Sequence, residues 1–181
     1  MRGILKLAAF VLVWAGFGAA SAAQQDVQDR ISAAELEQVL RDAGLEPTML
    51  KDGATGAPVA TVVFRDEDNL DSFGRPQQTV FVVRAMDCGG VPMKCGQLVL
   101  FANFDLSRDV TEQDFRVVNE FNDTSVHGRA FVLENKRQIG VDFRIDMIGG
   151  VTGDHIDGRI ERWPGVIREF RQRMQNANSG S

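Results

Sequence analysis

Hydrophobic and polar positions alternate with a period of two residues along six stretches of the chain, and this pattern predicts β-strands. The two clearest stretches, residues 77–86 and 97–106, are rich in Val and Phe. The others lie at residues 48–51, 59–65, 129–133 and 138–146. Strands that are joined by short turns form antiparallel hairpins, so we expect an antiparallel sheet of five to six strands.

Two helices are predicted from their first turns. Ser32 and Glu35 form a capping box, with Ile31 and Leu36 as its hydrophobic staple, and Gly44 ends the helix.

Thr111 can cap a second helix, on which Phe115, Val118 and Asn122 form one stripe. A buried amide is costly unless it is paired, so we expect Asn122 to bond backbone groups where this helix ends. A ligand contact is the alternative for Asn122.

A third helix is predicted after Thr152, beyond a break in the strand at Gly149 and Gly150. Its apolar residues recur at helical spacing: Ile156, Ile160, Trp163, Ile167, Phe170 and Met174. Pro164 should kink or restart this helix near Trp163. Five arginines on the helix, interleaved with Glu161 and Glu169, predict a solvated face. They are Arg159, Arg162, Arg168, Arg171 and Arg173.

The register of the second hairpin follows from its apolar positions. Pairing Leu133 with Gln138 places Ala130, Val132, Ile139, Val141, Phe143 and Ile145 on one face. The same pairing sets Arg129 opposite Asp142 on the other face, beside Phe131.

The cysteines, Cys88 and Cys95, flank a short turn in the first hairpin, so they face each other across it. We predict a disulfide, because a redox-active pair is normally spaced Cys-x-x-Cys and a zinc site needs two further ligands. This register puts Phe81, Val83, Ala85, Leu98, Leu100, Ala102 and Phe104 on one face of the hairpin. It leaves Val80, Val82, Arg84, Val99, Phe101 and Asn103 on the other.

The N-terminal residues 1–23 have the pattern of a signal peptide. Arg2 and Lys6 precede an apolar run, and cleavage is expected after Ala22 or Ala23. A retained membrane anchor is the alternative, but the run is short for one. We therefore predict a periplasmic or secreted protein with a polar leader at residues 24–31, one domain at 32–174 and a disordered tail at 175–181.

The net charge and the motifs of the sequence reduce the number of possible functions. The formal net charge is −5, and loss of Arg2 and Lys6 would make it more negative, which disfavours nucleic acid and anionic membranes as partners. No cofactor motif is present. The acidic run 66–71 lacks the spacing of a calcium loop, so we expect a solvated loop there.

The sequence supports an enzyme less well than it supports a binding protein. Its best candidates are His127 with Asp123 and Ser125, or His155 with Asp154 and Asp157, and neither set can be assumed to converge.

The order of these elements resembles the YbjN-like family of bacterial sensory-transduction regulators. The matching residues run from Ser32 to Met174 and include Asn119, Phe121, Asn122, Arg129, Asp142, Gly149 and Gly150, with Phe121 where the family often has Trp. The resemblance implies an α+β fold like that of type III secretion chaperones, in the order α-β-β-β-β-α-β-β-α, with helices on one face of the sheet. It also implies protein binding without catalysis. The signal peptide and the cysteine hairpin are departures from many relatives.

An apolar patch edged with charge often marks a partner surface. We therefore expect Val80, Val82, Arg84, Val99, Phe101 and Phe131 to bind a protein partner or a second copy of the chain. Two alternatives stay open: a loop or the acidic segment near Asp71 covers this patch, or a small apolar ligand binds between helix and sheet.

Overall fold

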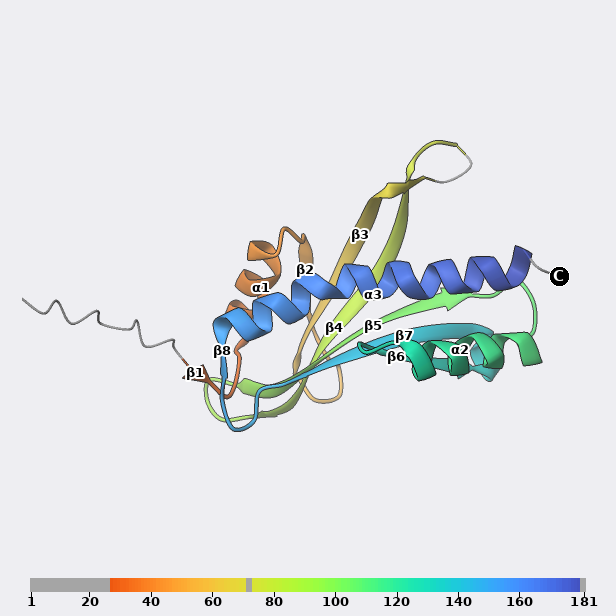
Figure 1. Cartoon of the computed structure of the whole chain (residues 1–181). Helices are drawn as coiled ribbons and strands as arrows, with labels where there is room; N and C mark the ends of the chain where they lie inside the picture. Colours follow the sequence, from red (N-terminus) through yellow and green to blue (C-terminus); the bar gives the residue numbers. More distant parts are fainter. Residues whose placement is uncertain (1–26, 71–72, 180–181) are drawn as a thin grey trace, which may run out of the picture.

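A six-stranded antiparallel sheet, in the order β2-β3-β4-β5-β7-β6, runs through the computed structural model (Figure 1). The structure describes residues 27–70 and 73–179. The strands are β2 (Pro47–Lys51), β3 (Pro58–Leu70), β4 (Pro76–Gly89), β5 (Lys94–Asp105), β6 (Arg129–Leu133) and β7 (Gln138–Asp146). A separate ladder pairs β1 (Val27–Gln28) with β8 (Val151–Thr152).

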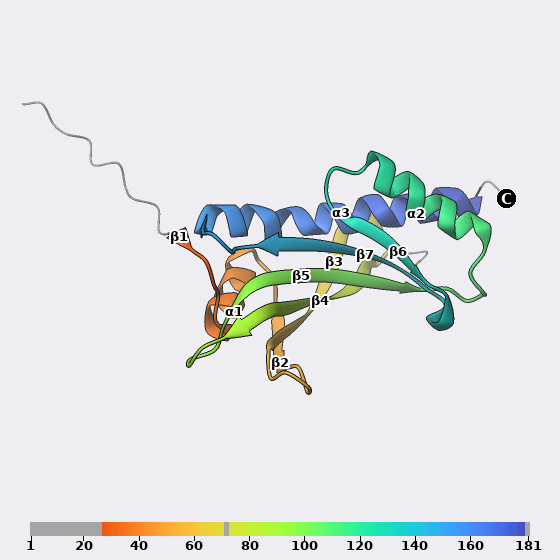
Figure 2. The ribbon, with the colours of Figure 1, turned by 90° about the horizontal axis from the view of Figure 1, so that it is seen from below.

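The helices are α1 (Ala33–Asp42), α2 (Glu112–Thr124) and α3 (Gly153–Ser179), and a 3-10 turn spans Glu134–Lys136. Seen from below, β4, β5 and β7 lie side by side, with α3 along the β7 side (Figure 2). Trp163 of α3 contacts Phe81 and Phe143, so α3 covers the sheet face that carries these two side chains. The predicted α+β class and the order of the main elements are confirmed. None of the helices in the described residues is long and apolar enough to cross a membrane.

The predicted registers are also confirmed. Leu133 pairs with Gln138, and Arg129 pairs with Asp142. Cys88 pairs with Cys95 and is joined to it by a disulfide. Apolar alternation sets these registers because a shift of one residue would turn every core side chain toward solvent.

Aromatic side chains of α3 fill the space between this helix and the sheet. Trp163 is fully buried and packs edge-on against Phe81, with ring centroids 6.0 Å apart. It also stacks on Phe143 at 6.2 Å. Farther along α3, Phe170 lies 5.1 Å from Phe121 of α2. Burial of such large apolar side chains is the main favourable contribution to folding.

Both capping predictions at α1 and α3 are confirmed. The Ser32 hydroxyl accepts from the Glu35 N–H, and the Glu35 carboxylate accepts from the Ser32 N–H. The Thr152 hydroxyl accepts from the His155 N–H at 3.3 Å.

The sequence suggested a solvated loop at residues 66–71. The structure instead shows a strand at residues 66–70, up to the last residue described before the gap. β3 continues through Leu70 and pairs with the start of β4, forming an arm that projects from the body (Figure 1). Asp66 is buried: it accepts a hydrogen bond from Asn69 and lies 3.6 Å from Arg168 of α3. Backbone pairing therefore outweighs the low strand propensity of these residues.

The buried stripe of α2 is displaced from the predicted one. It consists of Asp114, Val117, Val118 and Phe121, whereas Phe115 is 40% exposed and Asn122 is exposed. Asp114 accounts for this difference. An aspartate is usually a surface residue, but Asp114 is buried because Arg108 donates two hydrogen bonds to it, at 2.6 and 2.9 Å.

The two ends of the domain carry secondary structure that the sequence did not predict. α3 does not restart at Pro164, and it continues through Ser179, so residues 175–179 are helical. In the predicted leader, β1 is paired, and Ile31 is buried and exchanges two backbone hydrogen bonds with Cys95. The signal-peptide prediction and its cleavage site lie outside the described residues.

We expect reduction of the Cys88–Cys95 disulfide to lower the free energy of unfolding by about 2 to 3 kcal/mol, since the unfolded chain would regain the entropy of the closed loop. Urea denaturation with and without reductant measures this change. The Cys88→Ala/Cys95→Ala variant is the control and should not respond to reductant. Equal midpoints for the native protein under both conditions would contradict the prediction.

Asp114 should contribute to stability at neutral pH. Hydrogen bonds from Arg108, and then those from Thr111, hold the pKa of Asp114 below its ordinary value despite burial. The folded state therefore favours the ionised carboxylate. The contribution is complete above the unfolded pKa of about 4 and is lost as pH falls through the folded pKa.

Asp114→Asn should therefore lower stability by about 2 kcal/mol at pH 7 and flatten the acid limb of a stability–pH curve. Glu112→Gln, at an exposed position two residues earlier in the same first turn, is the control and should have a smaller effect. An unchanged acid limb in Asp114→Asn would count against this role.

Candidate binding surface

The sheet face turned away from the helices carries a continuous set of apolar side chains, which we call the open face. It consists of Val63, Val80, Val82, Val99, Phe101 and Phe131. Phe101 pairs with Val82 on β4 and with Asp142 on β7. Val80 is 54% exposed and its partner Val63 is 47% exposed. The segment 66–70, one predicted cover for this face, instead continues β3.

Phe131 of β6 reaches across β7 because its pairing partner on β7 is a glycine, Gly140. Gly140 pairs with Phe131 on one side and with Asn103 on the other. A Cβ atom at Gly140 would collide with the Phe131 ring and with the Asn103 side chain. The ring therefore lies over the Gly140 backbone and extends the open face onto β7.

Arginines edge the open face. Val99 pairs with Arg84 and with Arg144, so a guanidinium flanks it on each side. Arg84 lies 3.8 Å from Asp52, and Arg144 has no side-chain hydrogen bond or ion pair within the described part of the chain.

The cross-strand pair predicted at the start of β6 is present. Arg129 lies 2.6 Å from Asp142, which raises the pKa of Arg129. The Arg129 side chain is 70% exposed, so the pair is worth at most about 1 kcal/mol.

The structure also shows where the other residues of the family signature lie. Asn122 donates to the Ala130 carbonyl at 3.1 Å and accepts from the Ala130 N–H at 2.7 Å, which confirms that it bonds backbone at the helix end. Phe121 is fully buried, and Asn119 is exposed. Gly149 and Gly150 have φ angles of 92° and 95°, so the turn after β7 suits residues without a Cβ.

The candidate catalytic residues do not form a nucleophile–base pair. The Ser125 hydroxyl donates to the backbone carbonyl of His127, and the His127 ring is bonded to Arg162 at 3.1 Å. His155 is exposed and supplies its backbone N–H to the cap of α3. Among the described residues, no group of three or more His, Cys, Asp or Glu side chains is arranged to hold a metal ion.

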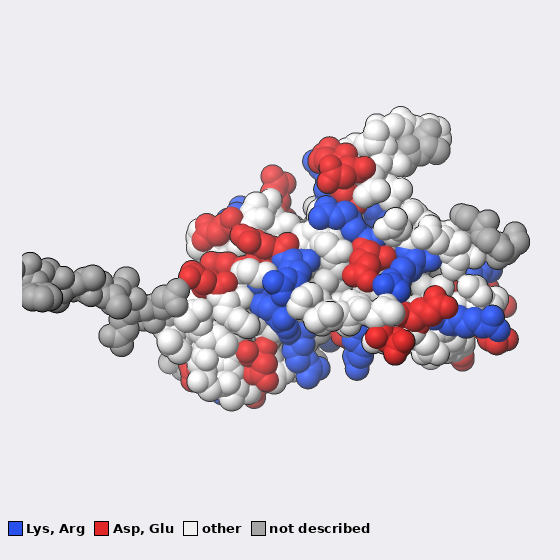
Figure 3. Space-filling model, in the orientation of Figure 1, with Lys and Arg blue, Asp and Glu red and all other residues white. Residues whose placement is uncertain are grey.

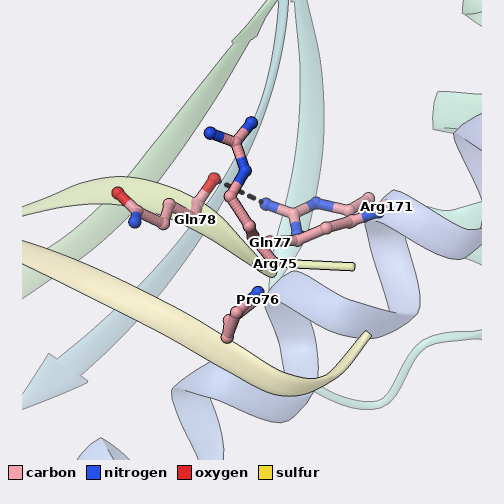
Figure 4. Close-up of a pocket in the computed structure, with 5 residues that line it drawn as sticks. All are labelled: Arg75, Pro76, Gln77, Gln78 and Arg171. Carbon is pink, nitrogen blue, oxygen red and sulfur yellow. Dashed lines mark hydrogen bonds between the residues drawn. The ribbon is translucent and has the colours of Figure 1, made fainter. Parts of the chain in front are cut away.

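A hollow of about 490 Å³ lies where the arm meets α3 (Figure 4). Arg171 extends from α3 to β4, where it donates to the Gln77 side chain at 2.8 Å and to the Gln78 carbonyl at 3.3 Å. Burial lowers the pKa of Arg171. These bonds tether the base of the arm to α3, so the role of Arg171 is explained by the fold.

A larger cavity of about 920 Å³ lies between the start of α1, β2 and the disulfide hairpin. Its apolar lining includes Ala34, Met49, Leu50 and Met93, with Lys94 at its edge. Lys94 is held 3.1 Å from Glu35 of α1. The sequence left open a small apolar ligand between helix and sheet, but it could not identify these residues, because the walls come from three segments that are far apart in the chain.

The family model named YbjN, described as "Putative bacterial sensory transduction regulator", matches residues 32–176. The chain belongs to this family. The description names a regulatory role and no enzymatic activity. No curated protein and no solved structure matches the chain, so the likeness to type III secretion chaperones stays a prediction.

Replacement of Gly140 by Ala should destabilise this YbjN-family domain by about 1 to 3 kcal/mol, because the added Cβ would displace the Phe131 ring. Gly158→Ala is the matched control. Gly158 lies inside α3 with open space around it, so this change should stabilise by about 1 kcal/mol. Thermal unfolding of both variants measures the difference. Equal shifts in Tm would show that Phe131 does not depend on Gly140.

Proposed function

We propose that this chain is an exported, non-catalytic member of the YbjN family that acts by binding a protein partner on its open face. The observation that carries the proposal is the apolar surface itself: helices cover one side of the sheet, and Val63 and Val80 are about half exposed on the other. An exposed apolar patch with a charged edge is typical of a partner surface. The regulatory description of the family supports a binding role.

The charges at the edge specify the kind of partner. Three arginines, Arg84, Arg129 and Arg144, flank the open face, and Asp142 is the carboxylate beside Phe101. A second copy of the chain would bring arginines toward arginines. A different protein, with apolar side chains flanked by Asp or Glu, would be complementary in both respects.

Export is part of the proposal. The N-terminal sequence has the pattern of a signal peptide, and a disulfide such as Cys88–Cys95 persists in oxidising compartments. The partner is therefore sought outside the cytoplasm.

Val80→Asp should abolish partner binding without unfolding the domain, because Val80 is exposed and a carboxylate there would repel an acidic, apolar surface. It is a cleaner variant than Phe101→Asp, which would place a second carboxylate opposite Asp142. Val91→Asp, in the turn of the disulfide hairpin, is the matched control.

The measurement is photo-crosslinking in intact cells from position 80 and from position 91, followed by identification of the attached protein. A partner joined only from position 80, and absent from a pull-down with Val80→Asp, would support the proposal. Light scattering that detects a dimer sensitive to Val80→Asp would indicate a second copy instead.

A second candidate function is favoured by the 920 Å³ cavity beside the disulfide hairpin. Its size and apolar lining suit a small apolar ligand. Native mass spectrometry of protein purified from the exporting cell separates the two functions. A bound small mass with no crosslinked protein would favour the cavity over the open face.

A further inference from the structure

A group of basic side chains surrounds a hollow of about 320 Å³ at the edge of the sheet, beside α3. The arginines that line it are Arg129, Arg144 and Arg159, and His127 completes the basic set. Asp142 is the one carboxylate among its lining residues, and it is already paired with Arg129. In Figure 3, Lys and Arg side chains form a band from α3 down over the strands beneath it. This concentration of positive charge is notable in a chain with a formal net charge of −5.

The hollow lies where β6 begins, because β6 starts only at Arg129, opposite Asp142. β6 pairs with β7 only up to Asp142, so the following residues of β7 lie at the edge of the sheet. There the Arg144 carbonyl accepts a hydrogen bond from Arg159 of α3 at 3.2 Å.

Gly128 allows the segment 126–129, which forms another wall of the hollow, to lie close to α3 and β7. A Cβ at Gly128 would lie 2.8 Å from Val166 of α3 and 3.2 Å from the Asp142 carbonyl, and its φ angle is 86°. Glycine therefore lets the chain pass tightly between α3 and β7, which places His127 next to Arg162.

Arg159 is the most constrained of the arginines. Its guanidinium lies 4.2 Å from the centre of the Phe143 ring, and its Nε is buried without a hydrogen-bond partner in the described part of the chain. Burial, together with the charge of Arg162, lowers the pKa of Arg159. Among the residues that the structure describes, no carboxylate lies within ion-pair distance to offset this cost. Arg159 is therefore only partly solvated, whereas the sequence predicted a solvated face along α3.

Arg144 adds a second guanidinium to the hollow, and unlike Arg159 its side chain donates to no group in the described part of the chain. It is exposed, and no hydrogen bond or ion pair of its guanidinium is present among the residues that the structure describes. Planar guanidinium groups donate parallel hydrogen bonds to carboxylates and phosphates. Two such groups beside one hollow match an oxyanion better than they match any other ligand.

We propose that the hollow between β7, the 126–129 segment and α3 is a binding site for an oxyanion group, a carboxylate or a phosphate, held by Arg144 and Arg159. Arg162 adds positive charge beside the hollow and is hydrogen-bonded to His127, whereas the charge of Arg129 is paired with Asp142. The site adjoins the open face through Asp142 and Arg144, yet it does not require a partner there. A test with free small anions therefore stands apart from the crosslinking experiment.

The experiment is a titration of the intact mature protein with sodium phosphate and, separately, with sodium acetate, at ionic strength held constant with sodium chloride. Amide chemical shifts from NMR are the readout. Saturable shifts should be confined to residues 126–129, 142–144 and 159. Arg144→Gln/Arg159→Gln should weaken binding by about tenfold or more, as expected when charge-assisted hydrogen bonds are removed.

The control is Arg41→Gln/Arg116→Gln, which removes the same charge from two exposed helix pairs elsewhere. This variant should bind as the native protein does. If the Arg159 substitution prevents folding, Arg144→Gln alone serves, because that side chain makes no contact that the fold requires.

A response to phosphate alone supports the site and indicates a phosphate-bearing ligand. A response to acetate as well supports the site and indicates that acidic side chains of a protein can fill it. The proposal is overturned if neither anion gives saturable shifts, or if Arg144→Gln/Arg159→Gln and the native protein respond equally.

Discussion

The packing of α3 on one face of the sheet is the interaction on which the rest of the structure depends. Trp163 contacts Phe81 and Phe143, which lie on different strands, so one helix joins the middle of the sheet to its β7 side. α2 is attached to the same helix through Phe121 and Phe170. A sheet has two faces, and this chain uses its helices to bury only one of them. The bare second face follows from this arrangement.

Strand β7 links the two surfaces to which we assign binding. Its outward residue Asp142 lies beside Phe101, and its neighbour Gly140 makes room for the Phe131 ring. Two residues beyond Asp142, Arg144 reaches the end of the strand that β6 leaves uncovered, where α3 supplies Arg159. A partner on the open face could therefore place an acidic group in the arginine hollow, although each surface can be tested by itself.

Much of the fold could be predicted because the relevant information is local. A period of two residues identifies strands, and burial of one face then sets which residues pair. For this reason Arg129 was correctly placed opposite Asp142, and Cys88 opposite Cys95. Asn122 was predicted correctly from the cost of an unpaired amide, although the structure shows it exposed at the helix end rather than on a buried stripe.

The sequence by itself determined the six main strands, the starts of the helices and the hairpin registers, since each depends on residues that are close in the chain, and the order of these elements indicated the family. The tertiary structure alone decided which charged groups became buried. Asp66 meets Arg168 only because β3 continues past α3, and Arg159 meets the Arg144 carbonyl only because β6 begins no earlier than Arg129 and leaves that part of β7 uncovered. The cost of burying a charge depends on partners brought from distant segments, and no local pattern of hydrophobic and polar residues records them.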